Sequence, residues 1–557
     1  MYHQVFRSFS VPTLFLLIVV GGCGNERPSH EIPLQMESTE EATESFANAM
    51  LDLGINLGKG NLGALRLSIT DPINAKTITP EFVETDQEIH LITGRTWVLA
   101  EERRSMTSQA FVHEIQTWLE HFSEIEDVRF KVKKSTVQDE GRAIEAELAL
   151  AFVGRNRAGI REWARGRAHV HAVRYEDSGW QLDHFEMTRM GSLEAEIDIF
   201  SEVALPAGLA RKDPTFLERT GPAFAAYGAA TADINGDGLL DIVTTAETGI
   251  NLYLNRGDGS FREASDETLV ASVPGDLVAP LLLDIDNDGD TDLFLSAIGT
   301  QKLLENRLIP DGRLEFWDVS LEKGVARPAV GFSAIAGDVN SDGFPDIYVN
   351  SYNRYGEVLP DRWDGATNGT PNLLFLNRGD GSFDEVAAEW GVADDRWGYA
   401  SGFADIDSDG DLDLYATNDF GGGNAMYINQ GDHFTDESLE RGVYDGAYGM
   451  GVSFADFDRD GDLDLHVTRM SSTAGRRILS RLGGGELPSR ERLETMAVGN
   501  ALYRNDGTGH FTDASNEAGP FGAGWAWGGG FVEIDNDGWP DVYTPNGFIS
   551  GSKLHDT

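Results

Sequence analysis

The sequence predicts a mainly β protein in which repeated four-stranded units follow a small α+β domain. Two observations carry this prediction: an acidic nine-residue segment occurs six times, at intervals of 51 to 77 residues, and 64 glycines supply many tight turns. With 557 residues the chain is long enough for two or three domains, each with its own core. A hydrophobic content of 41% argues against a disordered chain despite the charge.

Charge and cysteine content exclude several classes of partner and site. The formal net charge of −48 would repel a phosphate backbone, so no nucleic-acid partner is expected. A single cysteine, Cys23, rules out a disulfide within the chain and a metal site built from cysteines. The excess acid therefore serves either as a solvated surface or as cation ligands.

The first residues are typical of a targeting signal. The apolar run from Leu14 to Val20 is well short of the roughly 20 residues that a spanning helix needs, which favours a signal peptide over residues 1–22. Residues 20–23, Val-Gly-Gly-Cys, resemble the lipobox of bacterial lipoproteins. That resemblance implies lipidation of Cys23, a tether over 23–36, and anchoring at the outer membrane or cell surface. The alternative is an ordinary secretory signal with an incidental cysteine.

Residues 37–200 are expected to form the α+β domain. Apolar residues at helical spacing predict helices over 38–57 and 108–122, and alternating apolar residues predict the strands that follow. The segment 179–185 is similar to the last strand of SnoaL-like, nuclear-transport-factor-like cone folds. That likeness implies a pocket that Trp163, His169 and His171 could line. Two histidines at i and i+2 on a strand also fit a purely structural role.

The acidic repeat has oxygen donors at positions 1, 3, 5 and 9 and glycine at position 6. The candidate metal ligands are Asp233, Asn235, Asp237 and Asp241; Asp284, Asp286, Asp288 and Asp292; Asp338, Asn340, Asp342 and Asp346; Asp405, Asp407, Asp409 and Asp413; Asp456, Asp458, Asp460 and Asp464; and Glu533, Asp535, Asp537 and Asp541.

This spacing suits calcium. The ion takes six to eight oxygens at about 2.3–2.6 Å, and side chains at alternate positions converge if the chain curls around it. The curl needs a positive φ, which glycine adopts without strain. Position 7 is variable, which fits a backbone carbonyl ligand there. About six structural calcium ions are therefore predicted, and six acidic turns without metal would suffer strong repulsion among their carboxylates.

The residues around each loop indicate β-structure and exclude an EF-hand. An EF-hand needs an acid at position 12, whereas that position holds Thr, Leu, Val or Ala in all six loops. A glycine-rich strand precedes each loop and an apolar strand follows, and an Asn/Asp-Gly hairpin comes next, as in 251–261. Each repeat thus holds four strands. Such units at this spacing predict a β-propeller with six visible blades, and six or seven in total.

The repeats resemble the FG-GAP/VCBS propellers of integrin α heads and of bacterial cartilage-acidic-protein-like (ASPIC/UnbV-associated) proteins, over residues 214–557. The resemblance implies that calcium is structural. Residues around Phe216 could pair with the last blade and close the ring. Only 16 residues follow Asp541, so we expect a last blade that is truncated.

Two long loops are candidates for recognition: 351–370, and the arginine-rich 469–499. Both would lie on the face opposite the calcium turns, where a protein or glycan ligand is expected. The second loop could instead be a decoration whose arginines pair with neighbouring acids.

Catalysis is not predicted. No nucleophile elbow, phosphate loop or His-x-x-x-His pair appears, and His466 is expected to be packed in a strand. The sequence therefore favours a calcium-binding cell-envelope lipoprotein that binds a protein or glycan. The alternatives are an extracytoplasmic enzyme, either a polysaccharide-acting propeller or chemistry in the N-terminal domain, and a scaffold subunit.

Overall fold

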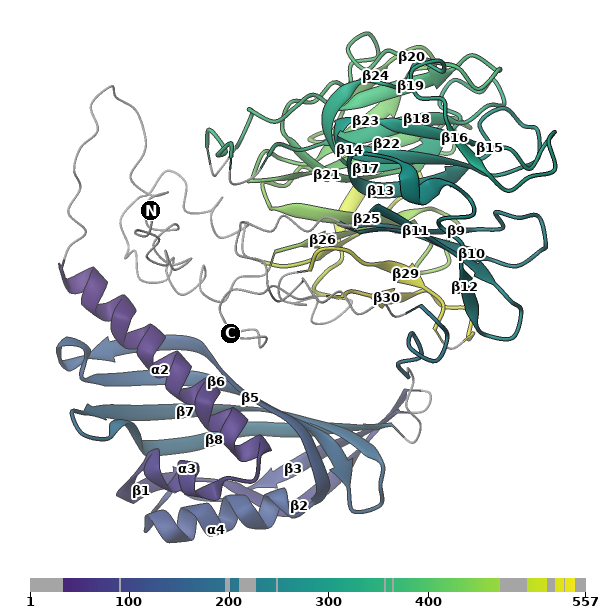
Figure 1. The fold of residues 1–557 in the computed structure, drawn as a ribbon. Helices are drawn as coiled ribbons and strands as arrows, with labels where there is room; N and C mark the ends of the chain where they lie inside the picture. The colour runs from purple at the N-terminus through teal and green to yellow at the C-terminus, as the bar shows by residue number, and fades with distance from the viewer. Residues whose placement is uncertain are drawn as a thin grey trace, which may run out of the picture. The chain divides into compact units, whose positions relative to one another are not determined.

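The computed structural model describes residues 34–89, 92–195, 201–209, 227–246, 249–354, 357–362, 365–470, 498–517, 526–534 and 536–545. The chain divides into two compact units, one ending at Ser201 and one spanning Glu202–Phe548 (Figure 1). The fold class is mainly β, as predicted, and a small unit with helices precedes the repeats. Residues 1–33, including Cys23, lie outside the described residues.

The first unit combines a curled sheet with helices. Its elements are α2 (Leu34–Gly58), α3 (Leu62–Leu67), β1 (Ile69–Lys76), β2 (Ile78–Ile89), β3 (Ile92–Leu99), β4 (Arg104–Met106), α4 (Ser108–Leu119), β5 (Phe122–Gln138), a 3-10 turn (Asp139–Gly141), β6 (Ala143–Asn156), β7 (Arg161–Tyr175) and β8 (Gly179–Ala195). The strand order is β2-β3-β8-β7-β6-β5, with β1 beside β4 and β8. Helices α2 and α4 pack on one face of this sheet (Figure 1).

Both predicted helices form. Helix α2 buries Phe46, Met50, Leu53 and Leu57, which recur every three or four residues and so share one face. Helix α4 begins where the Thr107 side chain accepts a hydrogen bond from the Ala110 amide at 3.2 Å. These apolar faces and the sheet make one core.

The expected pocket residues of β7 lie on the wrong face of the sheet. Ala164, Ala168 and Val170 are buried in the core, and strand alternation turns their neighbours to the opposite side. Trp163 is accordingly 39% exposed, and Nδ1 of His171 lies 2.6 Å from the Asp183 carboxylate. The prediction that Trp163, His169 and His171 line a pocket is therefore wrong.

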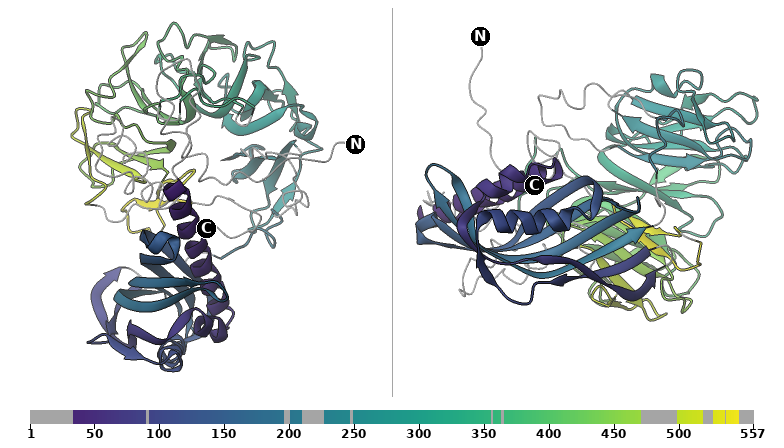
Figure 2. Two further views of the ribbon diagram at one scale, coloured as in Figure 1. Left: turned by 90° about the vertical axis from the view of Figure 1, so that its left-hand side faces the viewer. Right: turned by 90° about the horizontal axis from the view of Figure 1, so that it is seen from below.

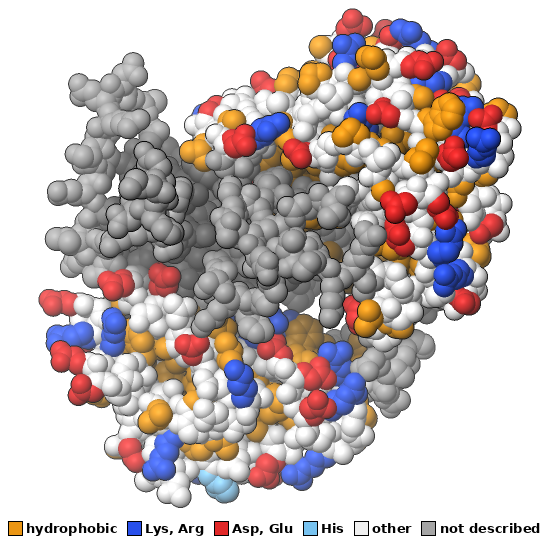
Figure 3. Space-filling view, in the orientation of Figure 1, with side chains coloured by type: hydrophobic (Ala, Val, Ile, Leu, Met, Phe, Trp, Pro, Cys, Tyr) orange, Lys and Arg blue, Asp and Glu red, His pale blue; other side chains and the backbone are white. Residues whose placement is uncertain are grey.

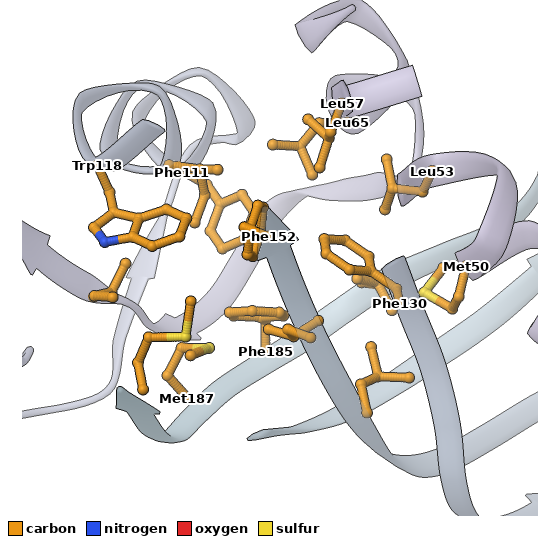
Figure 4. A pocket seen from close by; sticks show the side chains of 16 residues that line it. Met50, Leu53, Leu57, Leu65, Phe111, Trp118, Phe130, Phe152, Phe185 and Met187 are labelled. Carbon is orange, nitrogen blue, oxygen red and sulfur yellow. The ribbon is translucent and has the colours of Figure 1, made fainter. Parts of the chain in front are cut away.

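A small cavity lies in this core instead. Its volume is about 40 Å³ and its lining is wholly apolar (Figure 4). Phe111 and Trp118 of α4, Phe152 of β6 and Phe185 of β8 lie around it with Met50 of α2. The described lining therefore offers contact surface and no ionisable group.

The second unit consists of antiparallel sheets, one for each repeat except that repeats 2 and 3 share a single eight-stranded sheet (Figure 2). Repeat 1 holds β9 (Ala229–Ala232), β10 (Asp241–Ala246), β11 (Gly249–Asn255) and β12 (Phe261–Glu263); a 3-10 turn (Val270–Ser272) follows. Repeat 2 holds β13 (Asp276–Leu283), β14 (Asp292–Thr300), β15 (Lys302–Asn306) and β16 (Phe316–Asp318). Repeat 3 holds β17 (Pro328–Gly337), β18 (Asp346–Ser351), β19 (Leu373–Asn377) and β20 (Phe383–Glu385).

The later repeats follow the same plan. Repeat 4 holds β21 (Trp397–Ala404), β22 (Asp413–Asp419), β23 (Ala425–Asn429) and β24 (Phe434–Asp436), and repeat 5 holds β25 (Gly449–Ala455), β26 (Asp464–Arg469), β27 (Ala501–Asn505) and β28 (Phe511–Asp513). Five four-stranded units are thus described, each with its acidic loop between the first two strands, as predicted. The sixth repeat contributes β29 (Gly530–Val532) and β30 (Asp541–Tyr543) among the described residues. The proposed closing segment at Phe216 lies outside them.

An asparagine at the end of the third strand joins each repeat to the one before it. The side-chain amides of these asparagines donate to a carbonyl in the preceding acidic loop: Asn306 to Ile234 (3.1 Å), Asn377 to Ile285 (2.7 Å), Asn429 to Val339 (2.8 Å) and Asn505 to Ile406 (2.8 Å). All four asparagines are buried. Sheet-to-sheet packing in this unit therefore includes a regular ladder of buried hydrogen bonds.

Removing one rung of this ladder should destabilise the second unit. Asn429→Ala leaves the carbonyl of Val339 without its donor, and we expect a loss of about 2–4 kcal/mol in the free energy of unfolding, because buried unpaired polar groups cost about 1–3 kcal/mol each. Denaturant unfolding followed by tryptophan fluorescence measures the change. Gln430→Ala, at the exposed neighbouring position, is the matched control and should change stability by less than about 0.5 kcal/mol. Equal effects of the two substitutions would contradict the ladder.

Candidate calcium sites

Each acidic loop is folded around its first aspartate. In the first loop, Asp233 accepts hydrogen bonds from the amides of Asp237 at 3.0 Å and Gly238 at 2.8 Å. The same pair of bonds forms at Asp284, Asp338, Asp405 and Asp456. The glycine at position 6 has φ between 80° and 101° in all six loops, so the predicted positive φ is confirmed.

The aspartate at position 9 is buried at the base of each of the first five loops. Asp292, for example, is 1% exposed and accepts from the amides of Ile285 (3.1 Å) and Asn306 (2.8 Å). Asn306 is also a ladder residue. Its backbone amide donates to Asp292 of its own loop, and its side-chain amide donates to the carbonyl of Ile234 in the preceding repeat. Position 9 therefore ties the loop to the packing of the sheets.

Burial opposes ionisation of the position-9 aspartates. It raises the pKa of Asp292 to about 8, and the neighbouring carboxylates of Asp290 and Asp286 add to the rise, against the opposing backbone hydrogen bonds. Burial likewise raises the pKa of Asp346 and Asp413 to about 7. A bound cation would favour the charged form and offset this cost.

Three loops bring their carboxylates together. The ligand atoms of Asp284, Asp286 and Asp292 lie within 4.8 Å of one another, as do those of Asp405, Asp407 and Asp413 and those of Asp456, Asp458 and Asp460. These nine are all among the predicted ligands. Separations of this size allow several carboxylates to share one calcium ion.

Several oxygens of these loops are buried without a donor among the described residues. They are Oδ1 of Asp290, Asp407, Asp411 and Asp458. A buried carboxylate oxygen with no hydrogen bond is costly, and a cation is the ligand that would satisfy it. The donor set, all oxygen, fits calcium and does not fit a soft transition metal.

Position 7 carries side chains that the sequence prediction left out. We expected only a backbone carbonyl there, yet Asp290 is 4% exposed, and burial together with the nearby carboxylates raises its pKa to about 6. The pKa of Asp411 rises to about 6 for the same reasons. Variability at position 7 among the repeats concealed this contribution.

The sixth loop is described in part. Glu533 accepts from the amide of Asp537 at 3.1 Å, and Asp541 accepts from the amide of Ile534 at 3.1 Å, as in the other loops. Asp535 lies outside the described residues. The guanidinium of Arg459 lies 4.2 Å from the ring centre of Trp539, which links this loop to the one of repeat 5.

A second titratable cluster lies at one end of the sheet in the first unit. Nε2 of His121 lies 2.5 Å from Glu162, and Glu194 accepts from Arg95 (2.5 Å) and Asn156 (2.7 Å). Burial and the neighbouring Glu162 raise the pKa of Glu194. Burial opposes ionisation of Glu162 as well, but the hydrogen bonds from His121 and Ser192 and the charge of His121 together outweigh it and lower the pKa of Glu162. No sequence motif connects these residues, because they come from separate strands and the end of a helix.

The structure also shows the environment of two residues outside the acidic loops for which the sequence made a prediction. His466 is fully buried on β26, as predicted. Arg469 opens the arginine-rich loop, for which the sequence allowed either recognition or a decoration whose arginines pair with neighbouring acids. Arg469 is 4% exposed, pairs with Asp445 at 2.8 Å and donates to the carbonyl of Gly499 at 2.8 Å, as the second interpretation predicts. Arg469 is therefore structural, and residues 471–497 lie outside the described residues.

The surface offers no large patch of one sign on the face drawn in Figure 3, where acidic and basic side chains are interspersed on the described part of each unit. Among the described residues, no helix is both long and apolar enough to cross a membrane.

Sheets with an acidic loop between their first two strands define a propeller-like repeat protein. Comparison with family models is consistent with this class: FG-GAP-like repeats match residues 233–295, 284–349, 362–416 and 405–467. Cartilage acidic protein 1 of Mus musculus is 31% identical over 258 residues, and that of Homo sapiens is 30% identical over 258 residues. These alignments cover 43% of the chain, which spans about two-fifths of the length of these relatives, 39% and 38% respectively. Together they support an FG-GAP repeat family.

Two solved structures align with low scores. One, described as specific recognition of non-reducing terminal N-acetylglucosamine by an Agrocybe aegerita lectin, aligns over 80% of this chain and 92% of its own, with 14% identity and a TM-score of 0.31. A putative scytalone dehydratase from Novosphingobium aromaticivorans aligns over 29% of this chain and 93% of its own, with 7% identity and a TM-score of 0.22. Scores this low carry no argument about function.

The raised pKa values predict an inverted pH dependence for the metal-free protein. Asp292, Asp346 and Asp413 have folded pKa values of about 7–8, against about 3.9 in an unfolded chain. The folded state therefore binds more protons between about pH 4 and 8, so the free energy of unfolding should rise as the pH falls from 8 to 5.

Thermal melts at pH 8, 6.5 and 5 in excess chelator measure this dependence. The Tm should increase toward pH 5 in chelator, whereas saturating calcium, which favours the ionised carboxylates, should remove or reverse the increase. A chelated protein whose Tm falls steadily between pH 8 and 6 would contradict the assigned burial of these carboxyls.

Proposed function

We propose that this chain is a calcium-binding lipoprotein of the cell envelope whose repeat unit binds a protein or glycan, with calcium in a structural role. The observation that carries the calcium assignment is the set of buried loop oxygens without donors, at Asp290, Asp407, Asp411 and Asp458. Calcium near millimolar concentration outside the cytoplasm suits oxygen sites of modest affinity.

The ion's contribution would be electrostatic. Bound calcium supplies positive charge where the loop carboxylates crowd, and this chain's own residues supply the cage: side chains at positions 1, 3, 5 and 9 and the curl at glycine 6. Because the position-9 aspartates also hold the third strands, filling the loops would stabilise the sheets as well as the turns.

A recognition surface is proposed on the loop face opposite the calcium turns. An aromatic cluster underlies this face at the ends of the strands away from the acidic loops, where Tyr352 packs against Trp397 with ring centres 4.7 Å apart. The expanded loop 351–370 is anchored there through the buried Ala366. Leu359, in this loop, is 63% exposed. Exposed apolar side chains on an anchored loop are typical of contact surfaces.

The envelope location rests on the first residues of the chain. Lipidation of Cys23 would attach the protein to a membrane through a tether ending near Leu34, where α2 begins. Cys23→Ser should then release the protein from the membrane fraction without changing its fold, and retention of the variant in that fraction would contradict the lipid anchor.

Calcium removal tests the structural role. Each site filled at one hundred times its dissociation constant adds about 2.7 kcal/mol to the free energy of unfolding, so excess chelator should lower the Tm by many degrees. Isothermal titration calorimetry of the full chain with calcium, with a thermal melt at each point, measures both binding and stability. An unchanged Tm in excess chelator would contradict the calcium assignment.

Substitution on the loop face tests recognition. We expect Leu359→Asp to abolish binding of the calcium-loaded chain to hits from a glycan microarray and to cross-linked envelope proteins, because it places a charge on the proposed apolar contact. Leu439→Asp, at a 72% exposed position in the turn after β24, is the matched control and should bind normally. If both variants bind like the wild type, recognition lies elsewhere.

A further inference from the structure

The acidic loops described completely fall into two kinds. The Asp-rich loops, 284–292, 405–413 and 456–464, have aspartate at positions 3 and 7, and thus five carboxylates each. The Asn loops, 233–241 and 338–346, have asparagine at position 3 and an apolar residue at position 7, and thus three carboxylates each. The two kinds also differ in structure.

The Asn loops satisfy their own polar groups. The Asn235 amide donates to the Asp237 carboxylate at 3.0 Å, and its carbonyl oxygen accepts from the Asp237 backbone at 3.0 Å. Asn340 makes the same two bonds with Asp342, at 3.0 and 3.1 Å. The residues at positions 3 and 5 are therefore hydrogen-bonded to each other. These bonds, one of them charge-assisted, stabilise the curled backbone of the Asn loops.

The Asp-rich loops cannot do this, because an aspartate at position 3 has no proton to donate to position 5. Their carboxylates instead converge within 4.8 Å, a grouping that the described residues of the Asn loops do not form. Oδ1 of Asp407 and Oδ1 of Asp458 at position 3 are buried without a donor among the described residues, as are position-7 oxygens of Asp290 and Asp411.

A basic side chain holds the other oxygen of position 3 in two of these loops. Arg441 lies 3.2 Å from Oδ2 of Asp407, and Arg504 donates to Oδ2 of Asp458 at 2.7 Å. Each aspartate thus has one oxygen fixed by an arginine and one left open. Fixing the outer oxygen of a ligand in this way orients the inner one toward a metal.

Arg441 also belongs to the next repeat's interface. Its guanidinium donates to the carbonyl of Thr508 at 2.7 Å, and its own carbonyl accepts from the amide of Phe511 at 2.9 Å. Lys323 occupies the corresponding position in repeat 2. Its ammonium group donates to the carbonyl of Asp380 at 2.7 Å, and its backbone carbonyl accepts from the amide of Phe383 at 2.8 Å. Position 3 of the loop at Asp405 is therefore connected through Arg441 to the hairpin of the following repeat.

We propose that the calcium loops fill in two steps: the Asp-rich loops bind calcium tightly, and the Asn loops bind it weakly or only at high concentration. This inference rests on the proposed calcium-binding function. Calcium affinity rises with the number of charged ligands in the site, so two extra carboxylates at positions 3 and 7 should separate the dissociation constants by about tenfold or more. Arg441 and Arg504 act as positioning residues for the ligands at position 3.

Two reciprocal variants test this. Asn340→Asp with Phe344→Asp gives the loop at Asp338 the Asp-rich pattern, and Asp407→Asn with Asp411→Leu gives the loop at Asp405 the Asn pattern. Calorimetric titration of the full chain counts the tightly bound ions. We expect one more tight ion in the first variant and one fewer in the second, with the sixth loop contributing equally to all three proteins.

The outcomes separate this inference from the function on which it rests. No calcium binding by the folded wild type would overturn the calcium function itself. Binding with a single affinity for all sites, or variants whose tight-ion count equals that of the wild type while their circular dichroism is unchanged, would overturn the two-step filling alone. Should either variant fail to fold, the wild-type titration still decides, because one class of sites contradicts the proposal.

Discussion

The second unit depends on burying an aspartate at the ninth position of each of the first five acidic loops. A carboxylate placed beside other carboxylates and away from water opposes its own ionisation, as the pKa of about 8 at Asp292 shows. The chain nevertheless uses this side chain as an acceptor for two backbone amides, one in the loop and one at the end of the third strand. The buried carboxylate consequently holds the loop and the third strand together and also carries the electrostatic cost, which a bound cation would relieve.

The ladder asparagines extend this dependence from one repeat to the next. Asn306 donates to the preceding loop through its side chain while its backbone amide binds Asp292. The outer edge has a second link, because the amide of Phe511 on β28 donates to Arg441 of the repeat before. Nearest-neighbour contacts of this kind are typical of repeat proteins, whose stability is a sum of unit and interface terms. In this chain, the charge and cation occupancy of the acidic loops therefore affect the stability of the contacts between neighbouring repeats.

The first unit is organised differently. Its curled sheet and helices enclose an apolar core, and the buried carboxylates Glu162 and Glu194 lie at one end of the sheet, where they pair with His121 and Arg95. Each of these buried carboxylates has a basic partner, which offsets part of the cost of burying its charge, although Oε1 of Glu162 has no hydrogen-bond partner among the described residues. The interior and the network come from residues far apart in the chain, which is why neither was apparent from motifs.

By itself, the sequence determined the mainly β class, the four-stranded repeat, the curl at glycine 6 and the loop positions of the candidate ligands, because these depend on local spacing and turn chemistry. It also determined helices α2 and α4, whose apolar residues recur at helical intervals. Only the tertiary structure decided that Trp163 and His171 face away from the core, since a shift of one residue along a strand exchanges its faces. The pairing of Arg469 with Asp445 and the burial of Asp290 were likewise decided by packing between segments, which no local pattern specifies.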